Sequence, residues 1–140
     1  MEDGARSLEY APAPNRGALL CKGVSACTTL SEMNNLMSRV VLFRDIGISE
    51  PLEVLLLNAL GAKKGQGQSF SNAIIDQIVS FKPYVYDKHG FNGEWYSQTV
   101  VILSENRERS FVISAVGHKG DRSILNDLGR ALGQLISSVY

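Results

Sequence analysis

The spacing of apolar positions predicts a first helix that begins near Thr29. Thr29 and Glu32 have the spacing of a capping box, in which each side chain caps the backbone N–H of the other residue. Apolar residues then recur at helical spacing until Gly47 and Pro51, which are expected to end the segment. These apolar residues are Leu30, Met33, Met37, Val40 and Val41.

The middle of the chain predicts a strand followed by a second helix. Residues 54–60 form a short apolar run between Pro51 and Gly61, a pattern that indicates a strand buried on both faces. The polar residues after Gly61 have room for an irregular second strand. Ser69 or Ser71 then caps a helix, which Pro83 ends. The apolar face of that helix is Ala73, Ile74, Ile78 and Phe81.

The last third of the chain predicts a hairpin and a final helix. Two apolar strands, residues 98–103 and 110–116, flank the charged turn "SENRER". A helix that starts at Asp121 or Ser123 then carries one apolar stripe, and Gly129 with Gly133 indicates close packing of this helix against the sheet. The stripe is Ile124, Leu128, Ala131, Leu132, Leu135, Ile136 and Val139.

The order of elements predicts one α+β (α/β) domain, with a central, mostly antiparallel sheet flanked by helices at both ends of the chain. Residues 1–27 lack periodicity and contain "APAPNRGA", so we expect a disordered extension before a domain at residues 28–140. Cys21 and Cys27 form no metal-ligand or disulfide pattern, which favours a reducing, cytosolic setting.

Charge and hydropathy exclude several classes of protein. The 14 basic and 14 acidic residues cancel, so no overall field attracts nucleic acid. The acidic start "MEDGARSLEY" does not resemble a signal peptide, and no apolar run approaches the roughly 20 residues of a membrane span. These features predict a soluble, cytoplasmic protein.

The glycine-rich loop after Gly61 does not fit a nucleotide site. A phosphate loop needs Gly-Lys-Ser/Thr where Gln66 and Gly67 stand, and a dinucleotide fingerprint needs a third glycine where Phe70 stands. The loop is interpreted as a solvated turn, whose Lys63 and Lys64 are candidate contacts for an anionic phospholipid.

No catalytic or metal-binding constellation stands out in the sequence. His89 and His118 have no ligand-spaced partners and are expected in surface loops, while Asp121 and Asp127 are interpreted as helix caps and solvated residues. We therefore expect a binding protein without a cofactor, a metal or catalytic residues.

Aromatic residues cluster between the second helix and the hairpin, and the cluster has two interpretations. It is either a flap anchored in the core or a recognition surface. We assign Phe81 and Trp95 to the core, and leave both roles open for Tyr84 and Tyr86. The full cluster is Phe81, Tyr84, Tyr86, Phe91, Trp95 and Tyr96.

Three stretches together resemble the profilin family, in a divergent form that suggests an archaeal member with an N-terminal extension. "SFVISAVGHKGDRSILNDLGRALGQLISSVY" resembles the end of profilins, "EVLLLNALGAKKGQGQSFSNAIIDQIVSF" their first strand and following helix, and "FNGEWY" the start of the next strand. The resemblance implies a cytoskeletal protein that binds actin monomers, or an actin homologue, and regulates their polymerisation. The implied actin-binding residues are Tyr84, Tyr86, His118, Lys119, Arg122, Asn126 and Arg130.

Profilins also bind proline-rich ligands between their first and last helices, and some bind phosphoinositides. Tyr140 matches the last member of that cradle, whereas Met33 and Met37 stand where aromatic residues are expected and Gln134 where a histidine is usual. Lys63 and Lys64 would contact the phosphoinositide. The arm carries its own "YAPAP", so it either folds back to compete for the cradle or is a passive tail.

A second family has the same order of elements. Roadblock and longin domains are dimeric scaffolds that regulate small GTPases, whereas profilins act as monomers, so the resemblance to profilins implies a monomer. Architecture alone does not decide between the two families.

Overall fold

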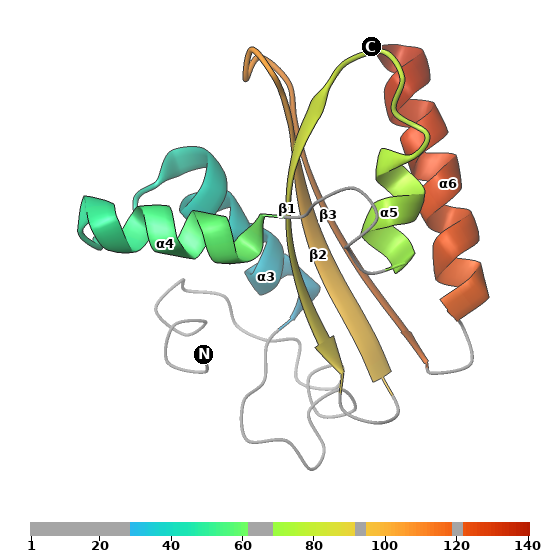
Figure 1. Ribbon diagram of the computed structural model, residues 1–140. Coiled ribbons are helices and arrows are strands. Elements are labelled where there is room, and N and C mark those ends of the chain that lie inside the picture. Colours follow the sequence, from blue (N-terminus) through green and yellow to red (C-terminus); the bar gives the residue numbers. More distant parts are fainter. Residues whose placement is uncertain (1–28, 62–68, 92–94, 119–121) are drawn as a thin grey trace.

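The computed structural model describes residues 29–61, 69–91, 95–118 and 122–140, which form a sheet between two helical layers (Figure 1). The sheet is antiparallel and three-stranded, which confirms the predicted α+β class. The strands, in spatial order, are β1 (Pro83–Phe91), β2 (Trp95–Ser104) and β3 (Ser110–His118). One layer contains α3 (Leu30–Met37), η1 (Ser38–Phe43) and α4 (Glu50–Leu60), and the other contains α5 (Ser69–Ile75) and α6 (Arg122–Val139).

The central strand β2 is buried on both faces over most of its length, in agreement with its apolar run at residues 100–103. Because successive side chains of a strand point to opposite faces, Val100 and Ile102 pack towards α5 and α6. Val101 and Leu103 pack towards α3 and η1. The core therefore consists of two apolar clusters, one on each face of the sheet.

The predicted hairpin and first helix are confirmed. β2 pairs with β3 around the charged turn, where Arg107 has a positive φ of 59°. In the predicted capping box, Thr29 donates its backbone N–H to Glu32 Oε2 at 2.6 Å, and Glu32 donates its own to Thr29 Oγ1 at 3.1 Å. The helix α3 continues into the π-helical segment η1, which ends at Arg44.

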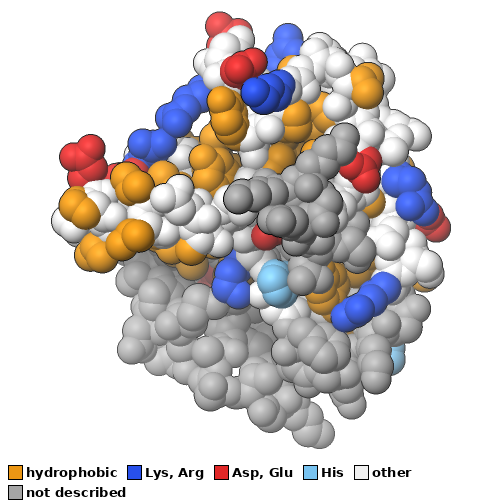
Figure 2. All heavy atoms as spheres, viewed as in Figure 1, with side chains coloured by type: hydrophobic (Ala, Val, Ile, Leu, Met, Phe, Trp, Pro, Cys, Tyr) orange, Lys and Arg blue, Asp and Glu red, His pale blue; other side chains and the backbone are white. Residues whose placement is uncertain are grey.

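The strand predicted at residues 54–60 is wrong, because this segment is helical. α4 begins at Glu50, and Pro51 lies in its first turn, where a fixed φ and a missing N–H cost nothing. Glu50 and Glu53 add favourable charge at the same end. Pro51, which was expected to end the first helix and precede a strand, therefore lies in the first turn of α4. Hydrophobic side chains remain exposed on α4, at the left of Figure 2.

The second predicted helix exists but is shorter than expected. α5 ends at Ile75, although Ala73, Ile74 and Ile78 are buried as predicted. Pro83 begins β1, so the proline does not end the helix directly. The possible strand between Gly61 and Ser69 lies outside the described residues, apart from a single bridge from Gly61 to Tyr86.

The final helix is confirmed, but its buried face differs from the predicted stripe. Ile124 and Leu135 are exposed, whereas Leu125, Gly129 and Gly133 are buried. The two glycines pack against α5 and not against the sheet. A Cβ on Gly129 would lie 2.9 Å from the Phe70 carbonyl oxygen, so a glycine permits the close approach of the two helices.

The sequence prediction missed β1 altogether, since residues 83–91 were assigned to a loop. Tyr96 is also buried in β2, and His89 and His118 lie on strands and not in the predicted loops. Phe81 packs against the core, as predicted. Within the part of the chain that the structure describes, no helix has the length and apolarity to cross a membrane.

Candidate ligand-binding site on strand β1

β1 is an edge strand, and it carries the tripeptide Lys88-His89-Gly90. Its inner edge pairs with β2 over its whole length. On its outer edge, the described residues contribute no further strand, and only the bridge from Gly61 reaches Tyr86. An open strand edge offers backbone donors and acceptors to an extended ligand.

A buried polar network anchors this strand to α5. Asp87 Oδ2 accepts hydrogen bonds from Ser71 Oγ at 2.8 Å and from Gln98 Nε2 at 2.9 Å. Gln98 Nε2 also donates to Ser71 Oγ at 3.1 Å, and Gln98 Oε1 accepts from the Tyr96 hydroxyl at 2.8 Å. Ser71 and Gln98 are almost completely buried, so each of these bonds satisfies a group that water does not reach.

The same network keeps Tyr96 protonated. Burial, with a smaller contribution from the negative charge of Asp87, raises the pKa of the Tyr96 hydroxyl to about 12, although the positive charge of Arg122 acts in the opposite direction. The Arg122 guanidinium lies 5.4 Å from the centroid of the Tyr96 ring. Tyr96 is therefore a fixed hydrogen-bond donor at neutral pH and not a candidate base.

Lys88 lies on the other face of the sheet, because neighbouring side chains of a strand alternate and Asp87 points to α5. Lys88 is exposed, and its Nζ donates to the His89 carbonyl oxygen at 2.6 Å. Its cross-strand partner is Thr99, whose hydroxyl lies 2.6 Å from that of Ser114. Ser114 in turn donates to Asn34 Oδ1 of α3 at 2.6 Å, so a polar row crosses the sheet beside the lysine.

Gly90 completes the tripeptide with a position that has little room for a side chain. A Cβ there would lie 3.1 Å from Ser97 Oγ on β2. A glycine at a strand edge also lets another backbone approach closely. The Lys88–Gly90 segment therefore combines an exposed cation with an accessible strand edge.

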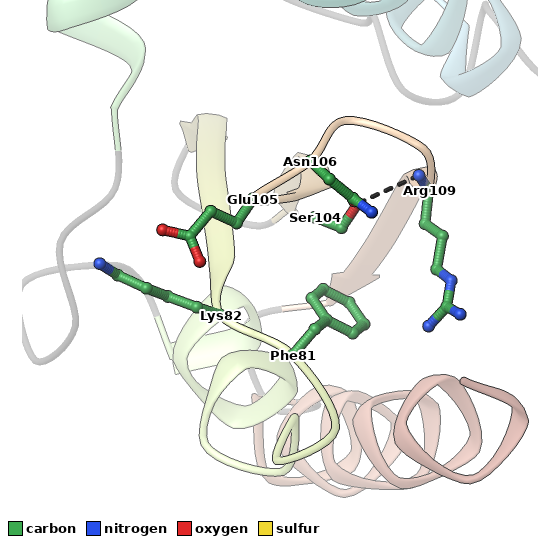
Figure 3. Close-up of a pocket in the computed structure, with 6 residues that line it drawn as sticks. All are labelled: Phe81, Lys82, Ser104, Glu105, Asn106 and Arg109. Carbon is green, nitrogen blue, oxygen red and sulfur yellow. Dashed lines mark hydrogen bonds between the residues drawn. The ribbon is translucent and has the colours of Figure 1, made fainter.

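A hollow of about 420 Å³ lies at the opposite end of β1 (Figure 3). Ser104 Oγ accepts from the Arg109 backbone N–H at 3.1 Å and donates to Asn106 Oδ1 at 2.6 Å. These bonds stabilise the β2–β3 turn, so we assign this hollow a structural role. It is lined by Phe81, Lys82, Ser104, Glu105, Asn106 and Arg109.

The structure does not bring the four proposed cradle residues together. Met33 and Met37 pack between α3 and the sheet, in the cluster that contains Val101. Gln134 donates to Gln77 Oε1 at 3.2 Å on the opposite side of the sheet. Tyr140 also lies on that side, with its ring 5.3 Å from that of Phe111.

The proposed actin-contact residues lie in several places. Tyr84 is exposed on β1, whereas Tyr86 packs against the α3 layer. His118 ends β3, and its ring meets the Trp95 ring edge-on at 5.6 Å. Of the residues proposed on α6, Arg130 pairs with Asp127, and Asn126 is only partly exposed.

Some predicted features lie outside the described residues. They are Lys63, Lys64, Lys119, Asp121, Cys21, Cys27 and the extension at 1–27. Their roles, and the division of the chain at residue 28, stay predictions. Among the described residues, no group of three or more His, Cys, Asp or Glu side chains could hold a metal ion.

One solved structure has a similar fold. It is a class A beta-lactamase from Mycobacterium abscessus, which matches with a TM-score of 0.60 and 18% sequence identity over 96% of this chain. The match covers 53% of that chain, so the present chain spans about half the length of the β-lactamase. At this identity, the likeness shows a shared fold alone. No family model and no curated protein matches the chain.

This likeness corrects two predictions. The resemblance to profilins is wrong, because the structural match is to a β-lactamase. The expectation of a binding protein that is not an enzyme is also contradicted, because the protein with the matching fold is an enzyme. The sequence analysis overlooked Lys88-His89-Gly90, although a run of β-formers, Tyr84-Val85-Tyr86, directly precedes it and could have indicated the strand.

Proposed function

We propose that β1 is the ligand-binding edge of a β-lactamase-type acyl-transfer site, and that its ligand is a carboxylate-bearing amide such as a β-lactam. The observation that carries this proposal is Lys88-His89-Gly90 on an edge strand, in a fold shared with a class A β-lactamase. Enzymes of that class carry the motif Lys-Thr-Gly beside Ser-x-x-Lys and Ser-Asp-Asn. In this chain, His89 stands in the place of the threonine.

The chemistry of the strand fits such a ligand. The exposed Lys88 ammonium can pair with a carboxylate, and charge-assisted bonds of this kind are stronger than neutral ones. The outer backbone edge can bind an amide in the manner of an added strand. Gly90 presents no side chain that would block this approach.

The network around Asp87 supports the same role. A binding strand at the edge of a sheet must keep its position when only one side is paired. Hydrogen bonds from Ser71 and Gln98 to Asp87 hold β1 in place on the face of the sheet opposite to Lys88. This arrangement leaves Lys88 exposed while its backbone is held.

The chain carries a variant of one of the three motifs. Its sequence contains no Ser-x-x-Lys and no Ser-Asp-Asn. We therefore assign binding and orientation of the ligand to this chain, and we assign no nucleophile to any of its residues.

Binding of a fluorescent penicillin, measured by polarisation, tests the proposal. We expect saturable binding that Lys88→Ala weakens about tenfold, the effect of losing roughly 1.4 kcal/mol from one charge-assisted bond. Lys82→Ala is the matched control, because Lys82 is another exposed lysine near the start of the same strand. Absence of saturable binding, or equal losses in both variants, would overturn the proposal.

The partners suggested by the sequence stay untested. Actin-monomer binding, with its proline-rich and phospholipid ligands, has lost its basis because it was implied by the resemblance to profilins. The alternative of a dimeric scaffold that regulates a small GTPase also stays a prediction, as does the cytoplasmic, cytoskeletal location.

A further inference from the structure

The helix α6 has two apolar faces, and only one of them is covered within the described structure. The inner face contains Leu125, Gly129 and Gly133 and packs against α5. α6 lies at the edge of the molecule (Figure 1), and its outer face carries an apolar stripe. Its large members are Ile124, Leu128, Leu135 and Val139, which are 62%, 45%, 58% and 61% exposed.

The outer stripe is nearly symmetric about its own centre. Leu128 and Leu135 are equidistant from the point between Ala131 and Leu132, and β-branched residues, Ile124 and Val139, stand at equal distances farther out. Ala131, a small and exposed residue, lies beside that centre. A second helix of the same sequence, running in the opposite direction, would therefore meet each large residue with one of similar shape.

We propose that this stripe binds a second copy of the chain, with the two α6 helices packed antiparallel about a two-fold axis beside Ala131. Ile124 then contacts Val139 of the second copy, and Leu128 contacts its Leu135. The small Ala131 lets the two helices approach closely at the axis. A contact of this kind is isologous, so it closes as a dimer and does not propagate.

The charges along α6 are compatible with the antiparallel arrangement. Asp127 flanks the stripe and is exposed, and its ion pair with Arg130 lies within the same helix. In an antiparallel pair, the two Asp127 residues lie about 14 Å apart along the axis, since the helix rises 1.5 Å per residue. Each then faces the flank that contains Gln134 and Ser138 of the other copy.

The size of the stripe predicts a weak dimer. From Ile124 to Val139 it is about 22 Å long, and one helix contact buries less than the roughly 800 Å² per partner of a standard interface. We therefore expect association in the micromolar range. This inference does not depend on the proposed ligand site, which lies on β1, and it differs from the monomer that the resemblance to profilins implied.

Sedimentation over a concentration series is the first test. We expect the mass to rise from one chain to two, and the double variant Leu128→Glu with Leu135→Glu to raise the dissociation constant about 100-fold or more, because carboxylates would be buried against apolar surface. The control is Leu52→Glu with Leu55→Glu on α4, where the leucines are 55% and 63% exposed. A monomer at all concentrations, or equal effects of both double variants, would overturn the proposal.

Cross-linking tests the geometry in a chain that keeps the stripe almost intact. Cys21 and Cys27 are first changed to serine, and a single Ala131→Cys or Ile124→Cys is then introduced. A short bismaleimide should join two Ala131→Cys chains, because these positions lie near the axis, and should not join two Ile124→Cys chains. Cross-linking of Ile124→Cys alone, or failure of Ala131→Cys, contradicts the antiparallel pair.

Discussion

Gly133→Ala is expected to destabilise the protein, although alanine is the better helix former. The added Cβ would overlap the Ile74 carbonyl oxygen and would lie 2.8 Å from Gln77 Cβ. Overpacking of this kind costs about 1–3 kcal/mol, and an obstacle in the backbone favours the upper part of that range. The gain in helix propensity offsets about 1 kcal/mol. We therefore predict a net loss of roughly 1–2 kcal/mol in the free energy of unfolding.

Urea denaturation, followed by circular dichroism, measures this loss, provided that the slope m is unchanged. The propensity term can be measured separately at Arg130, which is exposed on the same helix, by comparing Arg130→Gly with Arg130→Ala. That pair should differ by about 1 kcal/mol in favour of alanine. If Gly133→Ala also gained about 1 kcal/mol, α5 and α6 would not be in close contact at this glycine, and the reasoning would be refuted.

Three further substitutions test the polar interactions of the fold. Because the pKa of Tyr96 is raised to about 12 in the folded protein, the unfolded chain releases this proton at a lower pH, and the free energy of unfolding should fall as the pH rises above 10. By pH 11 the wild type should lose about 1.4 kcal/mol relative to Tyr96→Phe, and parallel pH profiles of the two proteins would contradict this. Asp87→Asn should lower the pKa of Tyr96, since it removes a negative charge that raises it, and an unchanged phenolate absorbance titration would exclude that cause. Thr29→Ala should cost about 1 kcal/mol in urea denaturation by removing the cap of α3, whereas Ser31→Ala, at an exposed position of the first turn, should cost little.

The elements that were predicted correctly are those whose signals are local. The capping box of Thr29 and Glu32 depends on residues three positions apart, and the structure contains both of its hydrogen bonds. The β2–β3 hairpin likewise combines two apolar runs with an adjacent charged turn. In both cases, contacts close in sequence determine the conformation, so the pattern alone was sufficient.

The elements that were missed depend on contacts between distant residues. The second half of β1 contains Asp87-Lys88-His89-Gly90, which has the composition of a loop, but Ser71 and Gln98, from other parts of the chain, bind Asp87. The error at α4 had a different cause, because Pro51 can either exclude a helix or begin one. Periodicity on α6 could not separate the two faces, since apolar residues cover both of them.

The candidate site on β1 could therefore be predicted only in part from the sequence. The sequence shows the tripeptide Lys88-His89-Gly90, but the pattern Lys-x-Gly often occurs by chance, so by itself it does not indicate a binding site. Its significance comes from two facts of the fold: β1 is an edge strand, and the outer edge beyond the Gly61 bridge receives no further strand from the described residues. Neither fact follows from periodicity.

The faces of the sheet explain why the order of elements was misleading. A cradle between a first and a last helix requires that both helices lie on the same face. Here α3 packs against Val101 and Leu103, whereas α6 belongs to the layer that covers Val100 and Ile102. Adjacent residues of β2 face opposite layers, because neighbouring side chains of a strand point in opposite directions. The sequence specifies helix, sheet and helix equally well for both arrangements, so only the pairing of each helix with a face of β2 can distinguish them.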